Sequence, residues 1–289
     1  MDGSAPHLHT AASCSRRQRT TPEQAVTWAP PNRKNERVTG DELNPTGFGG
    51  PSSGVWCDDA SPGMVARLAR LGFDWVCLDA QHGGYSRSEI IEVARSFPLG
   101  DTELVVRVSS CDFAAIGAAL DAGASAVIIP QIDSVAEARR AVAATFYPPV
   151  GGRSWGQLGR IWGGATVTAE EANSSTTCAV MIESAAALQS VEEIAAVDGV
   201  DQLFVGPYDL ALTLGTTVAA LLDDDSESSP LTRIVQAATT YGRTVGGFAG
   251  TPELAERFRE RGISCVAVAS DLWITAEGAR AALRRATAV

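Results

Sequence analysis

His82 is the only histidine in the body of the chain, since His7 and His9 lie in a polar N-terminal stretch. It follows an apolar segment of strand length that ends at Asp79, and Arg107 closes the next such segment. A neutral imidazole can accept a proton near pH 7, and a guanidinium can stabilise an oxyanion. A single histidine at a strand end could be structural, but charged residues at several strand ends together favour a catalytic site.

Two carboxylates extend this pattern, because Glu183 and Asp209 follow two later apolar segments. From adjacent strands they could share one cation, and carboxylates suit Mg²⁺ or Mn²⁺. The alternative is that each pairs with an arginine such as Arg107 or Arg153. No cysteine or second histidine joins them, which argues against a closed zinc site. The only lysine, Lys34, lies in the N-terminal stretch, so the folded body has no amine for a Schiff base.

The backbone after the segment 202–206 is a further candidate for substrate binding. Gly206 and Pro207 would bring the N–H groups of Tyr208 and Asp209 close to a substrate carboxylate, although Gly-Pro is also an ordinary turn.

The elements that must position these side chains are short apolar strands that alternate with helical segments. Helix starts are marked by Ser61-Pro62 and by Ser134 three residues before Glu137. Eight strands and eight helical segments predict a (β/α)8 TIM barrel, an α/β fold. A doubly wound open sheet is the alternative, but no G-x-G-x-x-G fingerprint follows the first strand. The expected strands are 54–57, 75–79, 103–108, 126–130, 178–183, 202–206, 244–248 and 265–269.

Composition places these elements in one large domain. The chain has 289 residues and 45% apolar residues. Residues 1–50 are polar and aperiodic and are expected to form a disordered extension, which leaves 51–289 as the barrel domain. The net charge of −11 argues against nucleic acid or an anionic membrane as a partner, and no apolar run approaches the roughly 18 residues needed to span a bilayer. Six cysteines without a C-x-x-C pair indicate a reducing compartment, the cytoplasm.

In this order, these residues resemble the HpcH/HpaI aldolase family, the class II metal-dependent pyruvate aldolases, from about Gly54 to the C-terminus. The matching segments are Gly54-Val55-Trp56, Gly72-Phe73-Asp74-Trp75 through Asp79-Ala80-Gln81-His82, Val105-Val106-Arg107, Leu120-Asp121-Ala122-Gly123-Ala124, Tyr147-Pro148-Pro149 with Arg153, Ile182-Glu183 and Gly206-Pro207-Tyr208-Asp209-Leu210.

The resemblance implies an enzyme that cleaves a 4-hydroxy-2-oxo acid into pyruvate and an aldehyde through an enolate. It implies a divalent cation, Mg²⁺, Mn²⁺ or Co²⁺, on Glu183 and Asp209. It also implies that His82 is the base and is paired with Asp121, that Arg107 steadies the enolate, and that Trp56 shapes the pocket. Members of the family are usually hexamers that exchange C-terminal helices, so a homo-oligomer is expected.

Three residues depart from the common family pattern around the implied site. Gln81 replaces a glutamate before the histidine, Met181 replaces a polar residue before the metal glutamate, and Tyr208 replaces a small residue beside the metal aspartate. These three departures are expected to alter substrate choice more than metal binding. Asp79 and Arg153 are also expected to lie around the reacting groups.

Two other functions remain open on the sequence. The same enolate site could serve oxaloacetate decarboxylation or carbon–carbon bond formation of the citrate-synthesis or lyase type. Alternatively, the barrel could bind a small acid without catalysis, with Gly246-Gly247 near a phosphate-binding position.

Overall fold

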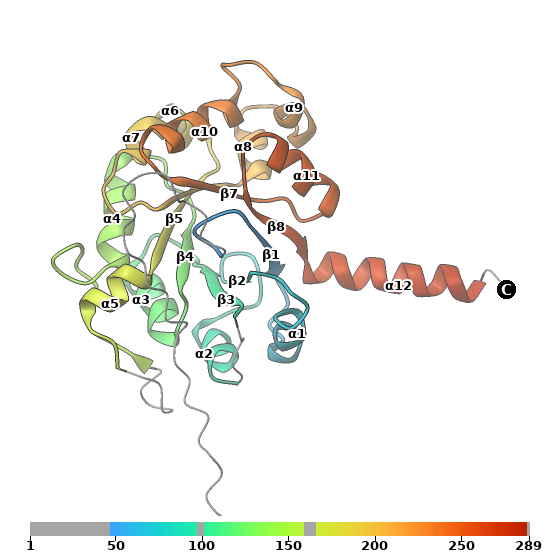
Figure 1. The fold of residues 1–289 in the computed structure, drawn as a ribbon, viewed down its shortest axis with the longest axis horizontal. Helices are drawn as coiled ribbons and strands as arrows, with labels where there is room; N and C mark the ends of the chain where they lie inside the picture. Colours follow the sequence, from blue (N-terminus) through green and yellow to red (C-terminus); the bar gives the residue numbers. More distant parts are fainter. Residues whose placement is uncertain (1–46, 97–100, 159–165, 288–289) are drawn as a thin grey trace, which may run out of the picture.

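The computed structural model describes residues 47–96, 101–158 and 166–287 (Figure 1). Most of the expected extension, residues 1–46, lies outside the described residues.

Eight parallel strands of the described residues form a closed barrel in which each strand pairs with the next and β8 pairs with β1. The predicted barrel is therefore confirmed, and the open sheet is wrong. The short Val-, Ile- and Cys-rich segments become strands because both of their faces are covered. The strands are β1 Ser52–Cys57, β2 Trp75–Asp79, β3 Glu103–Arg107, β4 Ala126–Ile129, β5 Thr177–Ile182, β6 Gln202–Val205, β7 Thr244–Phe248 and β8 Cys265–Ser270.

Helices surround the barrel and return the chain from the end of each strand to the start of the next (Figure 1). Ser61 and Ser134 cap α1 and α4 through their side chains, as the sequence predicted. The described helices are α1 Pro62–Leu68, α2 Arg87–Ser96, α3 Phe113–Ala122, α4 Val135–Thr145, α5 Ala169–Ser175, α6 Ala185–Gln189, α7 Val191–Ala195, α8 Pro207–Thr213, α9 Val218–Asp223, α10 Pro230–Thr240, α11 Pro252–Glu260 and α12 Asp271–Thr287.

The two-residue period of the strands decides which side chains enter the barrel. Alternate residues of β2, β3 and β5 form part of the interior cluster, and they include Trp75, Cys77, Val105, Ala179 and Met181. Continuing the same alternation points Asp79, Arg107 and Glu183 inward at the carboxyl ends of these strands. Those ends form the mouth of the barrel.

The opposite end of the barrel is filled by aromatic residues, one of which precedes β1. The fully buried Phe48 packs edge-on against Trp75 with ring centroids 5.2 Å apart, and it stacks on Phe204 at 6.2 Å. Its carbonyl accepts a hydrogen bond of 2.8 Å from Gln202, the first residue of β6. Residues 47–50, which the sequence analysis placed in the extension, therefore pack as part of the barrel.

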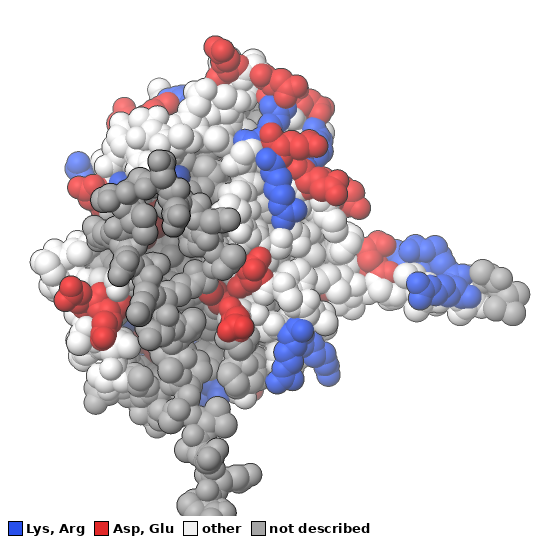
Figure 2. All heavy atoms as spheres, in the orientation of Figure 1, with Lys and Arg blue, Asp and Glu red and all other residues white. Residues whose placement is uncertain are grey.

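The last helix departs from the others because it extends away from the barrel (Figure 1). It starts at Asp271, and Asp271 is its only buried residue. Leu272 and Leu283 are largely exposed on it. Figure 2 shows basic side chains toward its end, where Arg284 and Arg285 lie. In the described part of the chain, no helix combines the length and hydropathy of a membrane span.

Phe48→Ala is expected to lower the free energy of unfolding by about 3–5 kcal/mol, because a buried aromatic ring is lost and a cavity remains. Urea denaturation measures the change. The control, Leu71→Ala, removes a side chain that is 71% exposed and should change stability by less than about 0.5 kcal/mol. Equal effects of the two variants would contradict the packing of Phe48.

Candidate active site

A buried ion pair between β2 and β3 lies at the centre of the mouth. Asp79 and Arg107 are register partners on adjacent strands. Nε of Arg107 donates to Oδ1 of Asp79 at 2.9 Å, and Nη2 donates to Oδ2 at 2.5 Å. The side chains are 1% and 11% exposed, respectively. This bidentate geometry fixes the plane of the guanidinium and leaves Nη1 outside the pair for a ligand.

The same carboxylate also holds three groups around it. The backbone N–H groups of Gln81 and His82 donate to Oδ1 of Asp79 at 2.9 and 3.3 Å. The indole N–H of Trp56 donates to Oδ2 at 3.3 Å. Asp79 therefore fixes the turn that carries His82 as well as the arginine.

The electrostatics of this group follow from its donors. Burial by itself would raise the pKa of Asp79, but the hydrogen bonds and charge of Arg107 outweigh burial, so the pKa is lowered. Arg107 also stacks over the Trp56 ring, with its guanidinium carbon 5.0 Å from the ring centroid. The carboxylate thus stays ionised and the guanidinium is held rigidly.

Glu183 follows β5 and is only 5% exposed. Its Oε1 accepts a hydrogen bond of 2.7 Å from the backbone N–H of Gln131, a residue with the unusual φ of 57° just after β4. Its Oε2 is buried and has no hydrogen-bond partner among the described residues. Burial and the negative charge of Asp209 raise the pKa of Glu183, against the opposing effects of Gln131 and Arg107. A buried carboxylate oxygen without a donor, facing another negative charge, calls for a cation.

The residues after β6 bring a second carboxylate, that of Asp209, to the side of the mouth where Glu183 lies. Asp209 lies exposed in the first turn of α8, which begins after Gly206 without a side-chain cap. Gly206 packs tightly: a Cβ there would lie 2.8 Å from Cβ of Glu183 and 2.9 Å from the methyl of Met181. Only glycine lets Glu183 and the start of α8 approach this closely.

The residues fit a divalent cation in the number of oxygen ligands they offer. Glu183 has a free buried oxygen, and the charge of Asp209 reaches it. In the described ranges, no cluster of three or more His, Cys, Asp or Glu side chains is placed to hold a metal. A cation here would have two protein carboxylates and would take its remaining ligands from water and substrate.

An arc of aromatic rings lines one side of the mouth. The ring centroids of Trp56 and Phe248 lie 5.0 Å apart, and those of Phe248 and Tyr208 lie 6.2 Å apart. Tyr208 is 53% exposed. The arc leads from Arg107, which stacks on Trp56, outward to Tyr208, and this outer end is exposed.

Two residues expected near the reacting groups lie elsewhere in the protomer. Asp121 is in the last turn of α3, which ends at the left-handed Gly123 just before β4 begins. Helices run opposite to the strands, so this turn lies at the end of the barrel away from His82. Asp121 pairs there with Arg153 at 2.6 Å, and Arg153 stacks on Tyr147. The expected pairing of Asp121 with His82 is therefore not made within one chain, and Arg153 does not reach the mouth.

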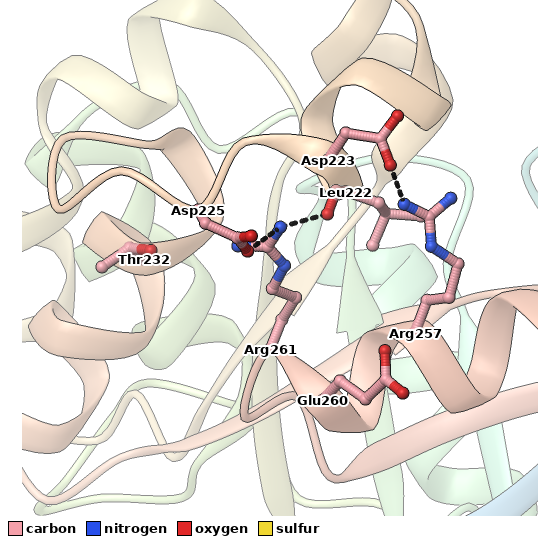
Figure 3. Close-up of a pocket in the computed structure, with 7 residues that line it drawn as sticks. All are labelled: Leu222, Asp223, Asp225, Thr232, Arg257, Glu260 and Arg261. Carbon is pink, nitrogen blue, oxygen red and sulfur yellow. Dashed lines mark hydrogen bonds and ion pairs between the residues drawn. The ribbon is translucent and has the colours of Figure 1, made fainter.

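A separate cavity of about 450 Å³ lies outside the barrel between α9, α10 and α11 (Figure 3). Its arginines are already paired: Arg257 contacts Asp223, and Arg261 contacts Asp225 at 2.6 Å. Figure 2 shows acidic and basic side chains intermixed over these helices. None of the predicted site residues lines this cavity.

Nearly the whole described barrel matches one known family. The family model of HpcH/HpaI aldolase/citrate lyase matches residues 52–277. This chain belongs to that family. The resemblance read from the sequence and the expectation of a carbon–carbon lyase are confirmed.

Individual relatives cover most of the chain. A hydroxypyruvate/pyruvate aldolase of Paraburkholderia phytofirmans is 35% identical over 245 residues, which are 81% of this chain and 92% of the relative. A 4-hydroxy-2-oxovalerate aldolase of Novosphingobium aromaticivorans is 33% identical over 80% of this chain and 88% of its own length. The crystal structure of a family protein from Burkholderia cenocepacia superposes with a TM-score of 0.74 at 30% identity, covering 82% of this chain and 95% of that one.

Sequence reasoning missed three residues of the mouth. Gln131 follows β4 directly and Phe248 closes β7, so the strand-end argument applied to every strand would have found both. Asp58 follows β1 in the same way. In all three the signal was the position of the residue at the carboxyl end of a strand.

Asp79→Asn is expected to cost about 3–5 kcal/mol of unfolding free energy, because Arg107 is left buried without its counter-charge. The folded-state pKa of Asp79 is lowered, so its contribution is present above the unfolded value of about 3.9 and is lost as the pH falls through the folded value. The difference between wild type and variant should therefore narrow below about pH 4 in urea denaturation. Glu192→Gln, at an exposed ion pair with Arg233, is the control and should cost under about 1 kcal/mol. A pH-independent difference for Asp79→Asn would contradict the assignment.

Proposed function

We propose that the protein is a divalent-metal-dependent aldolase that reversibly cleaves a 4-hydroxy-2-oxo acid into pyruvate and an aldehyde. The observation that carries the proposal is the buried, unpartnered Oε2 of Glu183 in the same mouth as Arg107 and the His82 turn. This supports a cation and an oxyanion-stabilising group acting on one small ligand.

Glu183 and Asp209 are the residues that would hold the cation, Mg²⁺ or Mn²⁺ by ligand type, with Co²⁺ also suited. When bound there, a divalent ion acts as a Lewis acid on a 2-oxo acid. The first-turn N–H groups after Gly206 are proposed to bind the substrate carboxylate. Gln81 and Met181 border the reacting groups, and Trp56 and Tyr208 shape the pocket.

The chain's own residues account for charge and proton movement. In cleavage, His82 takes the proton from the C4 hydroxyl as the C3–C4 bond breaks and the aldehyde forms. The electron pair of that bond becomes the enolate of pyruvate, whose negative charge Arg107 stabilises through its guanidinium. Transfer of that proton from His82 to C3 of the enolate then gives pyruvate and restores the starting charge. Asp79 supports both steps because it holds the arginine and the turn of His82 in place.

We also propose that the protein forms a homo-oligomer and that it lies in the cytoplasm. The projecting α12, with exposed Leu272 and Leu283, supports exchange of this helix between protomers. Within such an assembly, Asp121 and Arg153 would act at a mouth only if another copy supplied them. The described cysteines, Cys57, Cys77, Cys111, Cys178 and Cys265, are free thiols, which supports a reducing compartment.

Removing divalent metal is expected to abolish pyruvate release from 4-hydroxy-2-oxovalerate, and adding Mn²⁺ or Mg²⁺ should restore it. Borohydride with pyruvate should leave the enzyme active, because no Schiff base forms. A coupled assay for pyruvate measures both results. Pyruvate formation from oxaloacetate alone, with no aldehyde released from any 4-hydroxy-2-oxo acid, would replace the aldolase with a decarboxylase. Binding of pyruvate without any turnover would instead indicate a non-catalytic barrel.

His82→Ala is expected to slow exchange of the pyruvate C3 protons with solvent by about 10²–10⁴-fold, because the general base is lost. Proton NMR in D₂O measures the exchange. Mn²⁺ binding should remain intact in this variant, whereas Glu183→Gln should lose both exchange and Mn²⁺ binding. Near-native exchange in His82→Ala would remove the histidine from its role.

A further inference from the structure

Glu183 is held between the ends of two neighbouring strands, and its two carboxylate oxygens face different sides. β5, which it follows, pairs with β4 on one side and with β6 on the other. On the β4 side, Oε1 accepts a hydrogen bond of 2.7 Å from the backbone N–H of Gln131. On the β6 side, Oε2 lies where a Cβ on Gly206 would approach it to 2.9 Å. One oxygen is therefore occupied by a donor, and the other has no hydrogen-bond partner among the described residues.

Gln131 reaches this carboxylate in an unusual backbone conformation. Its φ of 57° is left-handed, and every other described residue with a positive φ is a glycine. A residue with a side chain is strained in this region, because its Cβ crowds the following carbonyl oxygen. The side chain of Gln131 is exposed, so its burial does not account for the strain. The backbone N–H, rather than the side-chain amide, is therefore the group that the conformation serves.

A second contact ties the loop after β4 to the residue that follows Glu183. The hydroxyl of Ser184 donates to Oδ1 of Asp133. The same hydroxyl oxygen caps α6 by accepting a hydrogen bond of 2.9 Å from the N–H of Ala187. The loop is therefore anchored to the end of β5 at two points, which fixes the backbone donor relative to the carboxylate.

The number of oxygens that Glu183 can offer bears on which cation suits it. Ca²⁺ takes about six to eight oxygen ligands and often binds both oxygens of a carboxylate, whereas Mg²⁺ keeps several waters and takes oxygens from one or two carboxylates. Mn²⁺ also suits octahedral oxygen ligation. With Oε1 bonded to an N–H group, Glu183 presents a single oxygen. That oxygen and the carboxylate of Asp209 match Mg²⁺ or Mn²⁺ and leave Ca²⁺ short of protein ligands.

We propose that Gln131 is a positioning residue for Glu183: its left-handed backbone keeps Oε1 engaged, so that Oε2 alone faces a cation and the site favours Mg²⁺ or Mn²⁺ over Ca²⁺. The inference rests on the metal-dependent function proposed above. The hydrogen bond stays in place when a cation binds, because the two use different oxygens. Partners of this kind orient a ligand before the metal arrives, which strengthens binding. The strained φ is the cost of this orientation.

The hydrogen bond can be tested without substrate, through exchange of the Gln131 amide proton in D₂O. NMR of the full chain labelled with ¹⁵N-glutamine follows the exchange, and Gln131→Ala identifies the signal. The amide should exchange at least about 10-fold more slowly in the metal-free wild type than in Glu183→Ala, because the carboxylate protects it. Glu192→Ala, at an exposed ion pair, is the control and should keep the protection, as should saturating Mg²⁺ in the wild type. Equal exchange in wild type and Glu183→Ala, or loss of protection when Mg²⁺ binds, would overturn the proposal.

The consequence for the cation is measured by competition between Mn²⁺ and Ca²⁺, with free Mn²⁺ followed by electron paramagnetic resonance. Gln131→Val places a β-branched side chain where φ must be positive, so the backbone N–H should turn away from Glu183. Mn²⁺ affinity should then fall by about 10–100-fold, because the orientation of the ligand is lost. The ratio of Mn²⁺ to Ca²⁺ affinity should fall by about 10-fold, because Oε1 becomes available to Ca²⁺.

Gln131→Gly is the matched control, because glycine keeps the N–H group and adopts a left-handed φ without strain. It should retain the wild-type Mn²⁺ affinity and affinity ratio, and it should raise the Tm of the metal-free protein by about 2–4 °C. Gln131→Ala, which shortens the exposed side chain, should also bind both ions as the wild type does. A changed ratio in Gln131→Ala would assign the effect to the side chain and would count against the proposal.

These outcomes separate the inference from the aldolase function. The expected affinities without pyruvate release from any 4-hydroxy-2-oxo acid would remove the aldolase function and leave the role of Gln131 intact. A wild-type affinity ratio in Gln131→Val, with folding verified by circular dichroism, would remove that role and leave the aldolase function intact. If Gln131→Val does not fold, the amide exchange, which compares proteins that keep Gln131, decides the matter.

Discussion

The carboxylate of Asp79 is the constraint on which the mouth of the barrel depends. It accepts hydrogen bonds from Arg107, Trp56 and the turn of His82, so a single buried charge orients three different groups. Burying that charge is costly, and the cost is offset only while all of these donors are in place. The arrangement is therefore cooperative: the ion pair, the indole and the histidine turn are formed together or lost together. A reacting centre built this way is rigid before any ligand arrives.

Around this neutral pair the mouth is acidic. Asp58 and Glu183 both have raised pKa values because each is partly buried and faces another acid. The free protein thus holds like charges close together, and a divalent cation beside Glu183 would relieve this repulsion. The same physical cause, burial of like charges, makes both halves of the site receptive to positive charge.

The barrel and the positions of Asp79, Arg107 and Glu183 could be predicted from the sequence, because the two-residue period of a strand fixes which side chains point inward. The pairing of Asp121 with His82 is not made within one chain, because Asp121 lies in the last turn of α3. The end of a helix that precedes a strand lies away from the mouth, and this rule was available from the order of the elements alone. Phe48 could not be recognised, since one aromatic residue in a polar, glycine-rich stretch has no periodic neighbours. The position of Asp58 at the end of β1 was open to the same strand-end reasoning, but its contacts with α12 and the histidine turn were not.

The packed rings of Phe48, Trp75 and Phe204 close the end of the barrel opposite the mouth. Substrate and products must therefore enter and leave through the mouth of the barrel. The order in which the products leave depends on how deeply each one is bound. Under the proposed function, a pyruvyl group beside Arg107 would lie further inside than a fragment resting on Tyr208, because Arg107 is largely buried and Tyr208 is exposed. The aldehyde at the outer position would have to leave before pyruvate, so the fold would set the order of product release.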